Sequence, residues 1–275
     1  MRTNARAAEQ CGPLTGRAPH PAIDARIKDF TSLLNQSATG RDLLHAATDY
    51  QNGQPAWMCF DTLEDAHALY YAGRGVLVVN ASKSNHEIVG DALHELRHLF
   101  HEKTGLYALH AESANDQAHL KYVSEADAEA TAALALWELK QAGHSGPWDK
   151  QDDPRSYDKR RVCYAHITTS FKNAVESGMS PALASVQAFR TWYRDKNLLS
   201  YYRDGVMETP NPAAGPEDTT SNPCTRADPA RLIRQFEMPS DPIMQQIMTR
   251  VGELPSYKIN YLQQAGGLKA ILSMP

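Results

Sequence analysis

Residues 84–105, SNHEIVGDALHELRHLFHEKTG, constrain the fold most, because they predict one long amphipathic helix with a signal at each end. Apolar side chains recur here at spacings of three and four residues, which places them on one helix face. Ser84 followed by Glu87 is a capping box, and Gly105 is a typical helix stop. The apolar residues are Ile88, Val89, Ala92, Leu93, Leu96, Leu99 and Phe100. The chain must therefore bury one face of this helix in a core.

A second predicted helix begins at Ser124 and continues to a glycine stop at Gly143. Its middle, EADAEATAALALWELKQ, is apolar almost all the way round, which indicates a buried helix rather than one on the surface. Many of its residues are alanines, and these would let a neighbouring helix approach closely. Its acidic residues, Glu125, Asp127 and Glu129, fall in the predicted first turn, where the helix dipole alone favours them.

The remaining pattern predicts several helices and little sheet. GVLVVN, residues 75–80, is a short apolar run after a glycine and indicates a strand. Further helices are predicted over residues 21–48, 157–177 and 180–203, the last with Ser180 as its cap. We therefore expect an α+β fold that is predominantly helical, with a small sheet packed on the helix of residues 84–105.

Proline and glycine divide the chain into four parts. Residues 1–20 are predicted to be a flexible tail, and residues 21–208 the main domain. TPNPAAGPEDTTSNPCTRADP, residues 209–229, holds five prolines and predicts a linker or an extended segment. Residues 230–275 contain helical patches and are expected to form a C-terminal helical appendage.

Composition excludes several classes of partner. The chain is 42% apolar and 22% charged, with a formal net charge of −4, so it lacks the basic excess of a nucleic-acid or membrane-surface protein. We find no signal peptide and no apolar run long enough to span a membrane. The four cysteines, Cys11, Cys59, Cys163 and Cys224, form no CxxC pair and are interpreted as reduced thiols. We expect a soluble cytoplasmic protein, while export as an effector by a non-classical system stays open.

The segment HELRH, residues 94–98, carries the chemistry. A helix places residues i and i+4 on one face, so His94 and His98 can bind one ion. Glu95, on the next flank, can reach a water on that ion and act as general base. His101 is seven residues from His94, about 10 Å along the helix axis, too far for both to bind one ion. The pattern predicts one zinc ion per chain.

A hydrolytic zinc site needs a third protein ligand. The helix of residues 124–143 offers Glu125 and Glu129, one turn apart on an otherwise apolar helix. A carboxylate carried into the interior needs a partner, and a cation supplies one. We favour Glu125 as the metal ligand and Glu129 as a hydrogen-bond acceptor for a ligand histidine. The reverse assignment stays open.

HExxH followed by ExxxE on a later helix resembles the gluzincin group of zinc metallopeptidases. The spacing from His98 to Glu125, with Ala128 and Ala132 beyond it, is similar to the peptidases that act on phage-immunity and radiation-response repressors. Glu129 and Thr131 depart from that family, which has asparagine and an aromatic residue at those positions. Over residues 60–205, VLVVN…ALHELRHLFHE and AFRTWYRD…LLSYYRD resemble an uncharacterised bacterial metallopeptidase family. These resemblances imply a zincin-like fold in which an extended peptide adds to the strand of residues 75–80.

The function predicted from this pattern is hydrolysis of a peptide bond through a zinc-bound water, with a protein or peptide as substrate. Oxyanion donors are to be sought among Tyr164, His166, Tyr201 and Tyr202. The alternative is a non-catalytic, metal-stabilised module for regulation or protein interaction on the same fold. Hydrolysis of a non-peptide amide or ester by the same chemistry is a third possibility, and a regulatory partner is not identified.

Overall fold

The computed structural model describes residues 10–50, 53–64, 66–103, 114–153, 164–195, 197–199 and 202. The chain divides into two compact units, one of residues 1–105 with 131–151 and the other of residues 106–130 with 152–275. Helix α5 (Ala114–Gln141) contributes residues to both units. The main domain expected over residues 21–208 stays a prediction, and the expected linker (209–229) and appendage (230–275) lie outside the described residues.

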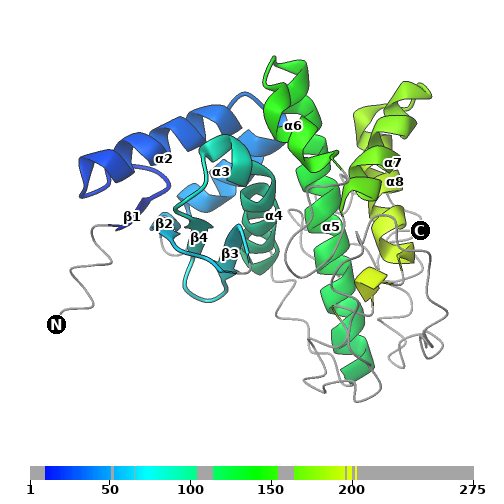
Figure 1. The fold of residues 1–275 in the computed structure, drawn as a ribbon. Coiled ribbons are helices and arrows are strands. Elements are labelled where there is room, and N and C mark those ends of the chain that lie inside the picture. Colours follow the sequence, from blue (N-terminus) through cyan, green and yellow to red (C-terminus); the bar gives the residue numbers. More distant parts are fainter. Residues whose placement is uncertain are drawn as a thin grey trace. The chain divides into compact units, whose positions relative to one another are not determined.

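A four-stranded sheet forms the base of the first unit (Figure 1). Its strands are β1 (Cys11–Pro13), β2 (Trp57–Asp61), β3 (Ala68–Tyr71) and β4 (Val76–Asn80), in the order β1-β2-β4-β3. Strands β2 and β4 are parallel, and the other two pairs are antiparallel. Alternate side chains of the central strands, Met58, Phe60, Leu77 and Val79, are buried. The sheet therefore contributes one of its faces to the core.

The strand predicted at residues 75–80 is confirmed as β4, but its expected role in substrate binding is wrong. Strand β4 pairs with β2 on one side and with β3 on the other, so its main-chain groups are already used. Among the described strands, the one at the edge on this side of the sheet is β3, whose apolar pattern is too short to signal a strand. Strand β1 falls within the segment predicted to be a flexible tail.

Four of the described helices lie wholly within the first unit. They are α2 (Pro21–Leu34), α3 (Ala38–Thr48), α4 (Asn85–Lys103) and α6 (Ser145–Gln151). The helical spacing over residues 21–48 is confirmed, and it corresponds to two helices, α2 and α3. Ser37 caps the second of them, its Oγ accepting a hydrogen bond of 2.7 Å from the Gly40 N–H. The turn is so tight that a Cβ at Gly40 would lie 2.4 Å from the Leu34 carbonyl oxygen. Helix α6 was not predicted.

Helix α4 matches the predicted amphipathic helix. The Glu87 carboxylate accepts a hydrogen bond of 2.8 Å from the Ser84 N–H, as a capping box requires. The whole predicted apolar stripe is buried, and its first six members have no exposed surface. The predicted stop, Gly105, lies outside the described residues. One face of α4 therefore packs in the core, as the periodicity indicates.

The second predicted helix starts much earlier than expected. Helix α5 begins at Ala114, so Ser124 lies inside the helix and the prediction that it caps the N-terminus is wrong. The predicted end is confirmed, because α5 stops at Gln141 and Gly143 adopts a φ of 95°. Near this end, Glu138 accepts hydrogen bonds of 2.8 and 3.1 Å from the N–H and hydroxyl of Thr39 at the start of α3. The acidic residues at 125–129 thus lie in the middle of a helix.

The second unit contains α7 (Ala165–Glu176) and α8 (Pro181–Arg194), which pack side by side (Figure 1). The predicted cap of α8 is confirmed, since Ser180 accepts a hydrogen bond from the Leu183 N–H. Helix α8 ends at Arg194 rather than at residue 203. Helix α7 confirms the later part of the helix predicted over 157–177, while residues 154–163 are outside the described residues. Tyr122 of α5 packs against Trp192 and Tyr193 of α8.

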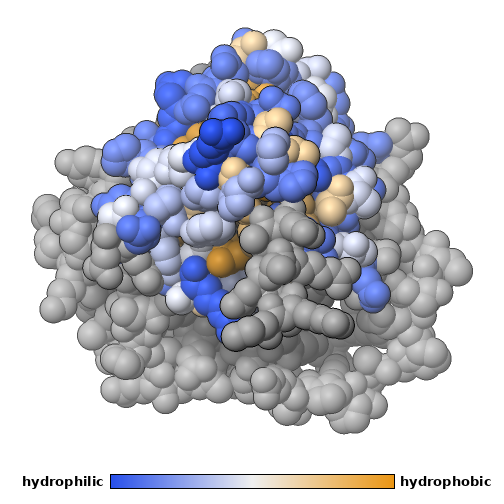
Figure 2. All heavy atoms as spheres, turned by 90° about the vertical axis from the view of Figure 1, so that its left-hand side faces the viewer, coloured by the Kyte–Doolittle hydropathy of each residue, from blue (hydrophilic) through white to orange (hydrophobic). Residues whose placement is uncertain are grey.

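On the face shown in Figure 2, the described side chains are mostly hydrophilic and apolar ones occur in small groups. Within the described ranges, no helix combines the length and apolar character needed to cross a membrane.

The cysteines differ from the prediction. Cys11 of β1 and Cys59 of β2 face each other in the strand register and form a disulfide. The interpretation of these two as reduced thiols is therefore wrong, because two cysteines 48 residues apart in sequence became neighbours through sheet pairing. Cys163 and Cys224 lie outside the described residues. Disulfides are rare in cytosolic proteins, so the cysteines no longer support the expected cytoplasmic location.

We predict that removing the disulfide by the double substitution Cys11→Ser, Cys59→Ser lowers the thermal midpoint on the order of 10 °C, because cross-linking a long loop contributes about 2–4 kcal/mol. Differential scanning calorimetry measures the shift. Peptide mapping of the unreduced wild-type protein should recover the Cys11 and Cys59 peptides as one linked species. Separate, unlinked peptides from protein purified without reductant would contradict the pairing.

Candidate metal centre

Two histidines on successive turns of α4 face each other. The Nε2 atoms of His94 and His98 are 2.9 Å apart, and their rings meet edge to face with centroids separated by 4.6 Å. Both side chains are buried, 8% and 5% exposed. The spacing of four residues on a regular helix places both imidazoles on one face, as the sequence predicted. Two nitrogen donors thus converge on one point in the interior.

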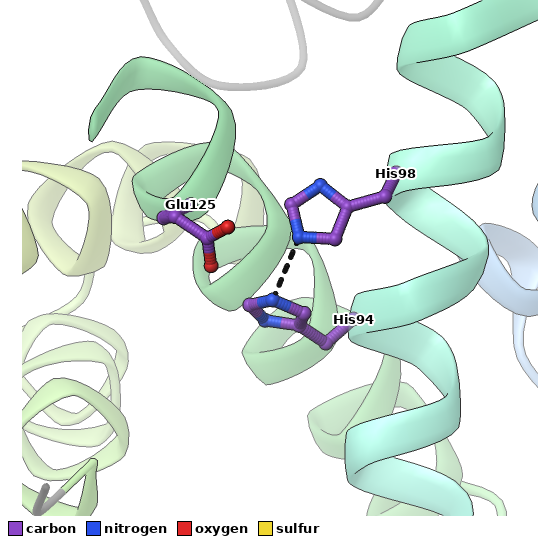
Figure 3. A group of neighbouring side chains, drawn as sticks. All are labelled: His94, His98 and Glu125. Atoms are coloured by element: carbon purple, nitrogen blue, oxygen red, sulfur yellow. Dashed lines mark hydrogen bonds between the residues drawn. The ribbon is translucent and has the colours of Figure 1, made fainter. Parts of the chain in front are cut away.

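A carboxylate from α5 completes the group (Figure 3). His94, His98 and Glu125 each offer a ligand atom, and these atoms all lie within 4.8 Å of one another. Glu125 is 2% exposed. Because it lies in the middle of α5, the dipole at a helix N-terminus does not explain it. A buried carboxylate on a helix rich in alanine requires a partner instead.

The donor set fits a zinc ion. Two nitrogens and one oxygen are ligands that zinc prefers, and three protein ligands leave a fourth position open to water. Ligands about 2.0 Å from a tetrahedral ion lie roughly 3.3 Å from one another. The separation of 2.9 Å between the two Nε2 atoms is close to that value.

Lys121 pairs with Glu125 and also lies near Tyr202, which in turn contacts Tyr164. The Lys121 ammonium lies 2.5 Å from Glu125 Oε1 and 5.8 Å from the centre of the Tyr202 ring. The hydroxyls of Tyr164 and Tyr202 are 2.9 Å apart. Burial, and then the negative charge of Glu125, raise the pKa of Tyr202 well above its usual value, so its hydroxyl stays protonated. Tyr202 is therefore a hydrogen-bond donor whose hydroxyl lies within the electrostatic influence of Glu125.

The remaining residues considered in the sequence analysis lie outside the group of His94, His98 and Glu125 or outside the described residues. Glu129 is buried, and its charge also acts on Tyr202, but it is not in the group with the two histidines. His101 is fully buried with its ring centroid 5.6 Å from that of His98, and it too is outside the group, as its distance along the helix predicted. The Nε2 atom of His166 lies 2.9 Å from Asp195 Oδ2. Tyr201 lies outside the described residues.

Glu95 is held by the edge strand β3. Its Oε2 accepts a hydrogen bond of 2.9 Å from the backbone N–H of Tyr70. The Tyr70 side chain extends to Glu102, one of whose carboxylate oxygens accepts from the Tyr70 hydroxyl at 2.6 Å. Burial, and then this hydrogen bond, raise the pKa of Tyr70, so the hydroxyl remains a donor. Sequence reasoning missed Tyr70, because a backbone N–H leaves no trace in a pattern of side chains.

Residues 5–209 match a family described as "Putative metallopeptidase family (DUF6782)". No curated protein and no solved structure matches the chain significantly. The family match extends beyond residues 60–205, over which the resemblance was inferred from sequence, and ends close to the predicted domain limit at residue 208. The predicted relation to a metallopeptidase family is confirmed: this chain belongs to the putative metallopeptidase family DUF6782.

Proposed function

We propose that this chain is a zinc-dependent peptidase that cleaves a protein or peptide substrate. The observation that carries the proposal is the buried group of two imidazoles and one carboxylate, His94, His98 and Glu125. This group adjoins Glu95 on α4, and a site that only stabilises the fold has no use for a base at that position. Membership of the metallopeptidase family supports the same reading.

The residues divide the chemistry between them. His94, His98 and Glu125 would hold the ion, and Glu129 would accept a hydrogen bond from a ligand histidine and fix its ring. A bound zinc ion would supply Lewis-acid chemistry, lowering the pKa of water towards about 7 and polarising the scissile carbonyl. Glu95 accepts the proton of the attacking water and passes it to the leaving amine. The Tyr202 hydroxyl donates to the oxygen on which negative charge develops.

Metal content tests the ligands. We predict about one zinc per chain for the wild type and a loss of at least tenfold in zinc affinity for His98→Ala and Glu125→Ala, because each removes a donor from a three-ligand site. Mass spectrometry of the purified proteins measures the stoichiometry. His67→Ala, which removes a partly exposed histidine outside the group, should keep the ion. Zinc retained in Glu125→Ala but lost in Glu129→Ala would move the third ligand to Glu129.

Turnover tests the base. We predict that Glu95→Gln keeps the zinc and the fold but lowers kcat at least 100-fold, since the amide has nearly the same shape and cannot accept the proton. Cleavage of an unstructured protein such as casein, followed by gel and mass spectrometry, measures activity. Wild-type activity in Glu95→Gln would contradict the mechanism. A zinc-loaded wild type that cleaves nothing would favour the non-catalytic interaction module.

A further inference from the structure

Helix α4 carries three acids on the face that meets the hairpin formed by β3 and β4 (the β3 hairpin). Asp91, Glu95 and Glu102 lie within about 40° of one another around the helix at 100° per residue. Each contacts the hairpin or the residue before it. Asp91 Oδ2 is 3.2 Å from Nδ1 of His67, Glu95 binds Tyr70, and Glu102 binds Tyr70 and Gly73. The edge strand is therefore attached to α4 by polar contacts at several positions along the helix axis.

The backbone of β3 explains why Glu95 binds the Tyr70 N–H. In an antiparallel pair, the N–H and C=O of one residue point to the same side, and the next residue points to the other. His67 turns its carbonyl towards β4, where it accepts from the Asn80 N–H at 2.8 Å. Tyr70, three residues on, therefore turns its N–H away from β4, out of the sheet. Glu95 Oε2 satisfies this edge group, which the sheet leaves without a strand partner.

The Tyr70 side chain anchors the same residue a second time. Its hydroxyl donates to Glu102, which lies seven residues beyond Glu95, about 10 Å further along the helix axis. Glu102 also accepts a hydrogen bond of 2.5 Å from the Tyr50 hydroxyl and bonds of 3.0 Å from the Gly73 N–H. One tyrosine thus spans two carboxylates of α4, the first by its backbone and the second by its side chain.

We propose that Tyr70 is the positioning residue of Glu95: its hydroxyl, held by Glu102, keeps β3 against α4, and its N–H sets the orientation of the Glu95 carboxylate. A carboxylate on a flexible side chain otherwise samples several rotamers, and only some direct an oxygen towards the attacking water. Tyr70 acts on the reaction through Glu95 and does not itself touch the reacting atoms. The consequence for turnover rests on the proposed peptidase function.

Tyr50 provides a matched control. It donates to the same carboxylate at nearly the same distance as Tyr70, yet it lies after α3 and not in β3. Tyr50→Phe and Tyr70→Phe therefore each remove one hydroxyl from Glu102, and similar losses of stability are expected. Only Tyr70→Phe removes a hydrogen bond by which β3 itself is attached to Glu102. A purely structural role predicts the same kinetics for both variants.

The first experiment compares the kinetics of the two zinc-loaded variants. We expect kcat to fall about tenfold in Tyr70→Phe, with KM and zinc content unchanged, because a misplaced base slows the chemical step and not substrate binding. Tyr50→Phe should stay within about twofold of the wild type in kcat. Equal kcat values for the two variants, or a change in KM alone, would overturn the positioning role while leaving the peptidase function intact.

The second experiment needs no substrate. Hydrogen exchange of the Tyr70 amide, followed by NMR, should accelerate at least tenfold in Glu95→Ala, because the N–H loses the acceptor that Glu95 provides. The Leu69 and Tyr71 amides, which turn towards β4, should keep their wild-type rates. An unchanged Tyr70 rate would overturn the proposal whether or not the protein cleaves. An inert wild type with the expected exchange would instead refute the peptidase function and leave the Glu95–Tyr70 contact standing.

Discussion

Burial of one face of α4 is the constraint on which the first unit depends. Ile88, Val89, Leu93, Leu96 and Leu99 are fully buried along this helix, and each such side chain contributes about 1.5–3 kcal/mol when it leaves water. The helix cannot rotate about its axis without exposing them. Its other flanks are thereby oriented as well, with two histidines towards one side and three acids towards the β3 hairpin. Apolar packing thus orients the polar residues that carry the chemistry.

The buried carboxylates in the middle of α5 are a second constraint, because each requires a compensating charge or hydrogen-bond donor. Glu125, Asp127 and Glu129 are 2%, 0% and 7% exposed on a helix otherwise dominated by buried alanines. Each buried carboxylate would cost several kcal/mol if it had no compensating charge or donor. Lys121 compensates Glu125, and a cation between the histidines and Glu125 would do so more directly. The same burial that costs stability excludes water and strengthens electrostatic interactions at the site.

Several elements could be read from the sequence because their causes are local. The start of α4 follows from Ser84 and Glu87, the start of α8 from Ser180, and the end of α5 from Gly143. His94 and His98 converge because helix geometry alone relates positions four apart. The break between α2 and α3 was missed, since the cap formed by Ser37 was not recognised between the two apolar groups. The true start of α5 was missed because a serine and an acid three residues apart also occur inside helices.

The sequence by itself predicted helix α4, the convergence of His94 and His98 on one of its faces, and Glu125 as the carboxylate that joins them, because these depend on helical periodicity and on the cost of burying a carboxylate. Only the tertiary structure decided which strand lies at the sheet edge, that Cys11 meets Cys59, and that Tyr70 reaches both Glu95 and Glu102. Those contacts join segments from different elements, and strand order and register arise from the packing of the whole sheet. Every residue except proline has a backbone N–H. A contact made by this group therefore leaves no signal in the pattern of residue types and could not have been predicted from it.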